Sequence, residues 1–312
     1  MATHFVFAPT PSRQAGADVP FFFDIDRAAG TLIAVEHAGF DSLLVDDAGG
    51  DLANFDVASR LTQAVASLTL QLSHSATSMD PLSTVRSLSM LARHALAAPT
   101  LRVRVEAGDG DHVEAWRRTD EYLLLLKRLW LNDLPIEHEG AFYHLRSAFI
   151  ADKAGLAGGV PLWLSDTSGI ALEVSARHAD VIPLPADSPD TLRLLIERVR
   201  GIAATRGRTR PIGFGVTLRL TDAAEDDRDP DSVLERVSAL VDLGVSHFTV
   251  TGTNDPERLR RLGDRLIAPL RRRDVRRADS RPLRANPGPL ANAIGRKNFA
   301  RPIPIGGRFS NK

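Results

Sequence analysis

Residues 160–182 read VPLWLSDTSGIALEVSARHADVI, and they contain the pattern that repeats through the chain. An apolar run over 161–164 is followed by a small polar turn, a helical pattern over 168–178 and a second apolar run over 180–183. Such short, nearly continuous apolar runs are typical of parallel strands that are buried on both faces. The stretch therefore predicts one strand–helix–strand unit of an α/β protein.

The same alternation extends from residue 4 to residue 273. Strands are predicted at 4–8, 42–45, 68–73, 101–105, 161–164, 180–183, 212–218 and 246–251. Helices are predicted at 25–38, 55–66, 81–97, 112–131, 168–178, 189–204, 231–243 and 256–273. Eight strand–helix units in about 270 residues indicate a TIM (β/α)8 barrel. A doubly wound sheet is the alternative, but the first turn, APTPSRQAG, lacks the glycine-rich fingerprint of that fold.

Two segments fall outside the unit pattern. Residues 135–147, PIEHEGAFYHLRS, alternate in short runs around a Glu-Gly pair and predict a small inserted β-hairpin. Residues 271–312 contain twelve Lys and Arg but only two acidic residues, although the whole chain has 39 of each sign. We expect a barrel over residues 1–273 and a basic, disordered tail over 274–312. With few aromatic residues and no recognisable module, the tail does not favour a nucleic-acid partner.

The composition narrows the possible chemistry. The chain has no cysteine, which excludes disulfides, thiolate metal ligands and a cysteine nucleophile. It has no HExxH, GxSxG or Walker motif, and its carboxylates are scattered, so we expect no metal site. No apolar run approaches the length of a membrane span, and the first residues do not resemble a signal peptide. We expect a cytoplasmic protein that is not associated with a membrane.

Polar residues at the carboxyl ends of the predicted strands are the candidates for function, because TIM barrels place their sites there. His4 and His247 lie near strand starts, and we assign them to stability. The candidates, in chain order, are Asp46, Asp47, Ser73, His74, Ser75, Thr77, Glu106, Asp109, Thr167, Ser168, Arg219, Thr251, Thr253 and Asn254.

The start of the helix at 168–178 has two interpretations. Its unpaired amides, with the hydroxyls of Thr167 and Ser168, would suit a phosphate group. Alternatively, one of these hydroxyls forms an ordinary N-cap. Asp166 argues against a phosphate, because its carboxylate would repel one unless it points away.

Two further candidates also allow two interpretations. His74 can serve as a base or cofactor ligand near neutral pH, or be a buried and hydrogen-bonded side chain. Arg219, at the end of the run GFGVTLR, can bind an anion, or it can pair with Asp222 or Glu106.

Three motifs resemble the bacterial-luciferase-like flavin monooxygenases, especially the alkanesulfonate and nitrilotriacetate monooxygenase branch. They are TDEYLLLLKRLW with the hairpin HEGAFYHLRSA within 119–148, the opening stretch 160–182, and ALVDLGVSHFTVTG at 239–252. The resemblance covers about residues 4–273. It implies a TIM barrel that forms a homodimer and binds FMN at its mouth. It further implies that a separate flavin reductase supplies reduced FMN, which uses molecular oxygen on a small organic substrate.

The resemblance also implies residue roles by position. For cofactor binding these residues are Thr167, Ser168 and Gly169 at the phosphate, with Asp47, Ser75, Thr77 and Trp116 nearer the flavin. For catalysis they are Arg219, His74 and His112. His112 matches a family histidine near the flavin, whereas Arg219 lies two positions past the place of an active-site arginine.

The chain also departs from the family pattern. Asp166 replaces the turn glycine, the loop after strand four is shorter, and the insertion before the helix at 231–243 is reduced to residues 221–230. Three hypotheses follow. The first is a reduced-FMN-dependent two-component monooxygenase. The others are an FMN- or deazaflavin-dependent hydride-transfer oxidoreductase, and a non-catalytic barrel subunit that supports an active partner.

Overall fold

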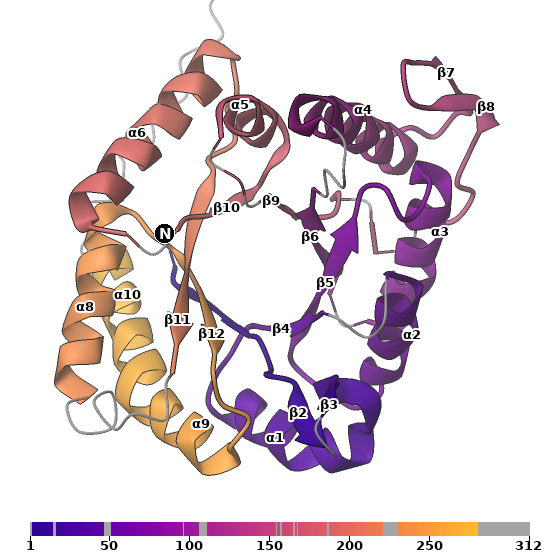
Figure 1. The fold of residues 1–312 in the computed structure, drawn as a ribbon. Coiled ribbons are helices and arrows are strands. Elements are labelled where there is room, and N and C mark those ends of the chain that lie inside the picture. Colours follow the sequence, from indigo (N-terminus) through magenta and orange to yellow (C-terminus); the bar gives the residue numbers. More distant parts are fainter. Residues whose placement is uncertain are drawn as a thin grey trace, which may run out of the picture.

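The protein is a closed α/β barrel with helices around it (Figure 1). The computed structural model describes residues 2–14, 17–46, 51–95, 97–105, 111–153, 155–156, 158–164, 166, 168–185, 187–220 and 230–279. Eight parallel strands close in the order β1-β12-β11-β10-β9-β6-β5-β4. Because β1 pairs with both β4 and β12, the sheet has no open edge. The prediction of a TIM barrel is confirmed, and the doubly wound alternative is wrong.

The predicted strands and helices are all present, with ends displaced by a few residues. The barrel strands are β1 (His4–Phe7), β4 (Ser42–Val45), β5 (Thr69–Ser75), β6 (Thr100–Arg104), β9 (Leu162–Leu164), β10 (Val181–Pro183), β11 (Gly213–Arg219) and β12 (His247–Thr251). The helices are α1 (Ile25–His37), α2 (Asp51–Leu61), α3 (Pro81–Ala92), α4 (His112–Leu131), α5 (Gly169–His178), α6 (Pro189–Thr205), α8 (Pro230–Leu243), α9 (Pro256–Leu262), the π-helical turn Gly263–Ile267 and α10 (Ala268–Asp279).

Local sequence signals explain several of these boundaries. Asp80 and Asp255 each precede a proline, and their side chains accept a hydrogen bond from the third following amide, at 2.9 Å and 2.8 Å. Gly39 and Gly244 follow α1 and α8 with φ of 84° and 104°, a left-handed conformation that favours glycine. These caps need no tertiary context, which is why the sequence predicts them.

Additional elements lie outside the eight units. The predicted hairpin is present as β7 (Ile136–Glu139) and β8 (His144–Ala148). A second hairpin, β2 (Ser12–Gln14) with β3 (Ala17–Val19), and a 3-10 turn at Phe21–Phe23 were not predicted. Their strands are only three residues long, too short for a periodic pattern. Helix α10 continues past residue 273 to Asp279, and the rest of the predicted tail lies outside the described residues.

Side chains of the barrel strands divide into two layers because they alternate between the faces of a strand. The outward layer is apolar and packs with the helices in one large core cluster, to which Phe5, Leu72, Val103, Phe214 and Phe248 belong. A second, small cluster comprises Val6, Ala8, Leu44, Trp163 and Val181. The strand registers place these residues on the opposite face, inside the barrel. Burial between strands and helices therefore dominates stability, and the interior can hold polar side chains.

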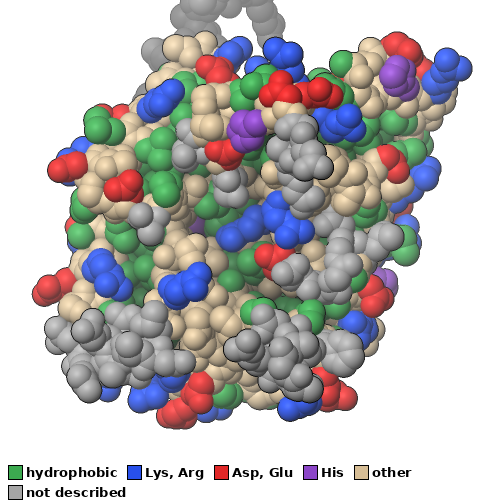
Figure 2. All heavy atoms as spheres, viewed as in Figure 1, with side chains coloured by type: hydrophobic (Ala, Val, Ile, Leu, Met, Phe, Trp, Pro, Cys, Tyr) green, Lys and Arg blue, Asp and Glu red, His purple; other side chains and the backbone are tan. Residues whose placement is uncertain are grey.

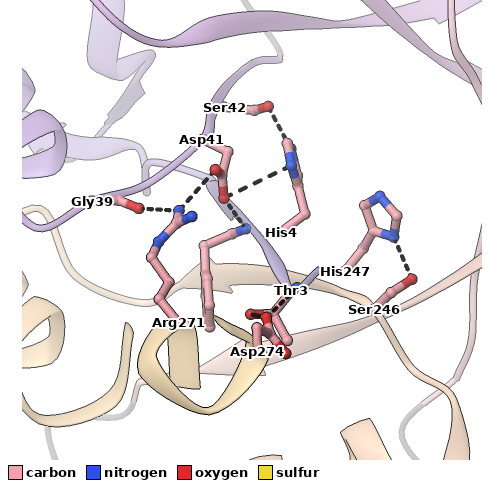
Figure 3. A network of polar contacts seen from close by, with 10 residues as sticks. Thr3, His4, Gly39, Asp41, Ser42, Ser246, His247, Arg271 and Asp274 are labelled. Atoms are coloured by element: carbon pink, nitrogen blue, oxygen red, sulfur yellow. Dashed lines mark hydrogen bonds and ion pairs between the residues drawn. The ribbon is translucent and has the colours of Figure 1, made fainter. Parts of the chain in front are cut away.

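Asp41 ties the first strand to the last helix at the amino end of the barrel (Figure 3). Its carboxylate accepts the Phe5 amide and an Arg271 Nη2 hydrogen bond, both at 2.7 Å. Arg271 Nη2 also donates to the Gly39 carbonyl at 2.7 Å. The amide and hydroxyl of Thr3 both donate to Asp274 Oδ2 at 2.7 Å. Helix α10 is thereby attached to β1.

His4 and His247 lie side by side in this amino-end region, as their assignment to stability expects (Figure 3). Their ring centroids are 5.2 Å apart, and His247 also contacts Trp163 edge-on at 5.1 Å. His4 Nε2 lies 2.8 Å from Ser42 Oγ. Burial, with a further contribution from His4, lowers the pKa of His247 to about 3.

Replacing Asp41 tests the closure. In Asp41→Ala, the Phe5 amide and Arg271 lose a shared acceptor, so we expect the free energy of unfolding to fall by about 2 kcal/mol. Asp56→Ala is the control, because Asp56 is 74% exposed and, among the described residues, its one ion pair is with Arg60 one helical turn away. We expect that control to change stability by less than about 0.5 kcal/mol in urea unfolding. Equal effects of the two variants would contradict the role given to Asp41.

The low pKa of His247 predicts a loss of stability in mild acid. Folded His247 stays neutral, whereas the unfolded chain binds a proton below its ordinary pKa of 6.5, so stability falls as the pH decreases below that value. The contribution is about 1.4 kcal/mol per pH unit. Urea unfolding between pH 7.5 and 5 measures it. His247→Gln should flatten the profile, and His37→Gln, at an exposed position, should not. An unchanged slope in His247→Gln would refute this assignment.

Candidate functional site

Four polar side chains meet where α4 and α5 begin. His112 and Trp116 lie in the first turns of α4, and Asp166 and Ser168 lie between β9 and α5. His112 Nε2 is 3.0 Å from Ser168 Oγ and 3.4 Å from Asp166 Oδ2. Trp116 is almost fully buried, and its Nε1 donates to Asp166 Oδ2 at 3.1 Å. Three of the predicted site residues are therefore neighbours, and we call this group, with Asp166, the α4–α5 cluster.

The Asp166 carboxylate lies where an anion at the start of α5 would be bound. Its Oδ1 accepts the Ser168 amide at 2.8 Å, while Trp116 donates to Oδ2 and His112 lies beside it. The Ser168 hydroxyl makes no cap bond to its own helix, so the ordinary N-cap interpretation does not hold for Ser168. A Cβ added at Gly169 would meet no atom of the described residues within 4 Å. The Ser168 amide and the Trp116 indole would suit an oxyanion, but both already donate to the Asp166 carboxylate.

Two arginines of β6 form a second polar group. Arg102 extends across the barrel interior, where its Nη2 donates to Thr249 Oγ1 at 2.9 Å and its guanidinium lies 5.0 Å from the Trp163 ring centre. Burial lowers the pKa of Arg102 to about 10, and nearby Asp46 opposes that shift. Arg104 Nη1 is 3.5 Å from Asp46 Oδ1. Figure 2 shows Lys and Arg side chains near the centre of the ring of elements seen in Figure 1.

Sequence reasoning missed both of these arginines. The signal was the alternation in LRVRV, because Leu101 and Val103 belong to the outward, helix-facing core. Residues of the opposite parity, Arg102 and Arg104, must then face the barrel interior.

His74 lies away from the α4–α5 cluster, within the packing between the barrel and its helices. It is fully buried, its Nε2 is 2.5 Å from the Tyr122 hydroxyl, and its ring stacks on Tyr122 at 5.8 Å. The Tyr122 hydroxyl donates in turn to Thr84 Oγ1 at 2.7 Å. This placement favours the interpretation of His74 as a buried, hydrogen-bonded side chain. His74 lies an even number of residues from the core residues Leu70 and Leu72, so its side chain points to the same, helix-facing side of the strand. This alternation was the available sequence signal.

The remaining predicted residues are distributed around the barrel. Ser75 Oγ and Thr77 Oγ1 are 2.9 Å apart, and Ser75 is the register partner of Arg104. Arg219 is exposed at the end of β11 beside Thr251, and within the described ranges it forms no ion pair. The predicted residues that lie outside the described ranges are Asp47, Glu106, Asp109, Thr167 and Asp222.

An apolar cavity of about 460 Å³ adjoins the ends of β1, β4 and β12. The segment between β1 and α1 supplies much of its wall, and this segment includes the 3-10 turn that the sequence did not predict. Asp46 and Thr251 are the polar residues in the lining. The full lining is Ala8, Pro9, Pro11, Pro20, Phe21, Phe22, Leu44, Asp46 and Thr251.

The described parts of the chain contain no group of three His, Asp or Glu side chains that could hold a metal ion. Those parts also contain no helix that is both long and apolar enough to cross a membrane.

The closed barrel is a TIM barrel, and its polar groups and apolar cavity lie at the carboxyl ends of the strands, where TIM barrels place their functional sites. Residues 2–242 match the family model described as luciferase-like monooxygenase. The chain therefore belongs to the luciferase-like monooxygenase family, which comprises flavin- and F420-dependent monooxygenases and oxidoreductases.

Solved structures share this fold at low sequence identity. Long-chain alkane monooxygenase has a TM-score of 0.74 at 14% identity, covering 88% of this chain and 92% of that one. EDTA monooxygenase from Chelativorans sp. BNC1 has a TM-score of 0.72 at 12% identity, covering 88% and 95%. An F420-dependent secondary alcohol dehydrogenase, bound to an F420-acetone adduct, has a TM-score of 0.70 at 14% identity, covering 87% and 99%. At these identities the likeness shows the shared fold.

Proposed function

We propose that the protein is a reduced-FMN-dependent monooxygenase of a small organic substrate, supplied with reduced flavin by a separate reductase and acting as a homodimer. The observation that carries the proposal is the α4–α5 cluster, which gathers oxyanion donors at a helix start in a chain of the luciferase-like family. The bound flavin would supply the redox and oxygen chemistry. The chain's own residues would bind it, orient it and exclude water.

The donor set fits the phosphate of FMN on one condition. The Ser168 amide and hydroxyl, the Trp116 indole and the His112 imidazole are four donors around one position, at the positive end of α5. Asp166 must turn aside for a phosphate to use them, because two anions in one set of donors repel each other. We assign phosphate binding to His112, Ser168 and the first amides of α5, and we assign to Asp166 a weakening of that binding.

The apolar cavity suits the part of the reaction that needs dry surroundings. Phe21, Phe22 and Leu44 line it, so the cavity can hold an apolar group of a ligand or substrate away from water. Asp46 lines the cavity and also pairs with Arg104, so the cavity adjoins the arginines of β6.

The other two hypotheses remain alternatives with their own support. Hydride transfer with FMN or the deazaflavin F420 is supported by the family's F420-dependent members. A non-catalytic, supporting subunit is favoured by Asp166, whose carboxylate already holds the donors at the start of α5.

A flavin titration separates FMN-dependent chemistry from F420-dependent hydride transfer and from a supporting subunit. Purified protein is titrated with FMN, oxidised and then anaerobically reduced, and with F420, followed by fluorescence and calorimetry. We expect saturable binding of reduced FMN in the micromolar range and weaker binding of oxidised FMN. Binding of F420 alone would favour hydride transfer. Binding of neither cofactor would contradict the proposal and favour the supporting subunit.

Replacing Asp166 tests the phosphate position. We expect Asp166→Asn and Asp166→Gly to bind FMN roughly tenfold more tightly, because a like charge near the phosphate is removed. Their affinity for riboflavin, which lacks the phosphate, should stay the same. Asp187→Asn, an exposed replacement in the turn before α6, is the matched control. Unchanged FMN affinity in both Asp166 variants would mean that the phosphate does not bind at this helix start.

A further inference from the structure

Arg102 is a half-buried cation, with its Nε fully buried, and it has no matching anion among the described residues. A guanidinium has five N–H donors. The one hydrogen bond of Arg102 to a described residue is that of Nη2 to the Thr249 hydroxyl, a neutral acceptor. No described carboxylate lies within ion-pair distance, since the nearby Asp46 pairs instead with Arg104. The Trp163 ring face supplies part of the missing stabilisation, but it carries no net charge.

Neighbouring polar groups are also incompletely satisfied. Ser73 is the register partner of Arg102 on the adjacent strand, so the two side chains share the interior face of the barrel. Ser73 Oγ, Gln71 Oε1 and Arg102 Nε are all buried and find no hydrogen-bond partner in the described part of the chain. Buried polar atoms are almost always paired, and a buried unpaired charge is costly. Arg102 Nε and Ser73 Oγ can both donate, so these two atoms on neighbouring strands indicate a position that a bound acceptor completes.

We propose that the barrel interior beside Arg102 and Ser73 binds an anionic group of the ligand, with Arg102 as its counter-charge. The inference rests on the proposed function, because Thr249, which Arg102 contacts, lies on β12 two residues before Thr251 in the cavity lining. The group is a planar or delocalised anion, which the flat fork of a guanidinium suits. It can come from the ring of reduced flavin, which is anionic near neutral pH, or from a carboxylate or sulfonate of the substrate.

Arg219, the residue that the sequence suggested for an anion, is less suited to this role. Its side chain is exposed, so solvent and salt weaken its attraction for a charge. The Arg102 guanidinium lies inside the barrel, where the same charge acts through fewer water molecules.

Arg102→Met removes the charge with a side chain of similar length. Two quantities are measured for wild type and variant. The first is the ratio of the dissociation constants of oxidised and reduced FMN. The second is the affinity for methanesulfonate and for acetate, by calorimetry at constant ionic strength. Arg193→Met is the matched control, because Arg193 is a half-exposed arginine of α6 that pairs with Asp190.

We expect at least one of these quantities to fall fivefold or more in Arg102→Met and neither to change in Arg193→Met. A smaller redox ratio identifies reduced flavin as the anion, and a loss of methanesulfonate or acetate affinity identifies the substrate. If both quantities equal those of wild type, the inference is overturned. If wild type binds FMN in neither state, the proposed function fails, and the oxyanion measurements alone then decide the inference.

Thermal unfolding shows whether the Arg102→Met variant is folded. We expect Arg102→Met to melt at or above the temperature of wild type, because a half-buried charge with no described counter-charge is removed. If Arg102→Met does not fold, Arg102→Lys and Arg102→Gln replace it. Lys keeps the charge and should retain part of the effect, whereas Gln should lose it. Equal behaviour of Lys and Gln in both measurements would overturn the inference.

Discussion

The pairing of β1 with both β4 and β12 closes the barrel, and the other features of the molecule depend on that closure. A closed sheet has no free edge, because its first strand in the chain pairs with its last. Asp41 and Asp274 support this meeting by attaching β1 to α10. Without closure, the strand ends that carry the candidate site would not face one another.

Closure also decides which side chains meet inside the ring. Arg102 on β6 reaches Thr249 on β12, although 147 positions separate them in the chain. The outward layer of the strands is apolar and provides most of the burial. The interior therefore tolerates Arg102, Ser73 and Gln71, whose polar atoms are incompletely paired. A stable outer layer thus supports an interior that carries incompletely paired polar atoms at some cost in stability.

The candidate site was predictable only in part. His112, Trp116 and Ser168 were identified by resemblance, and the structure brings them together around Asp166. His74 was chosen by its place at a strand end, but that place does not say which way the side chain points. A strand alternates its faces, so a shift of one residue exchanges the barrel interior for the helical layer. Leu70 and Leu72 are core residues that face the helices, and His74 is two residues further along the same face of the strand, so it also faces the helices.

The sequence by itself determined the eight strand–helix units, the inserted hairpin and the family resemblance. These depend on local hydrophobic periodicity, on caps such as Asp80 and Asp255, and on motifs contained in single segments. Only the tertiary structure decided that Trp116 and His112 meet Asp166 at the start of α5, and that Arg102 reaches Thr249 with no described carboxylate beside it. Those facts depend on contacts between distant strands and helices, which exist only after the ring has closed and which no local pattern encodes.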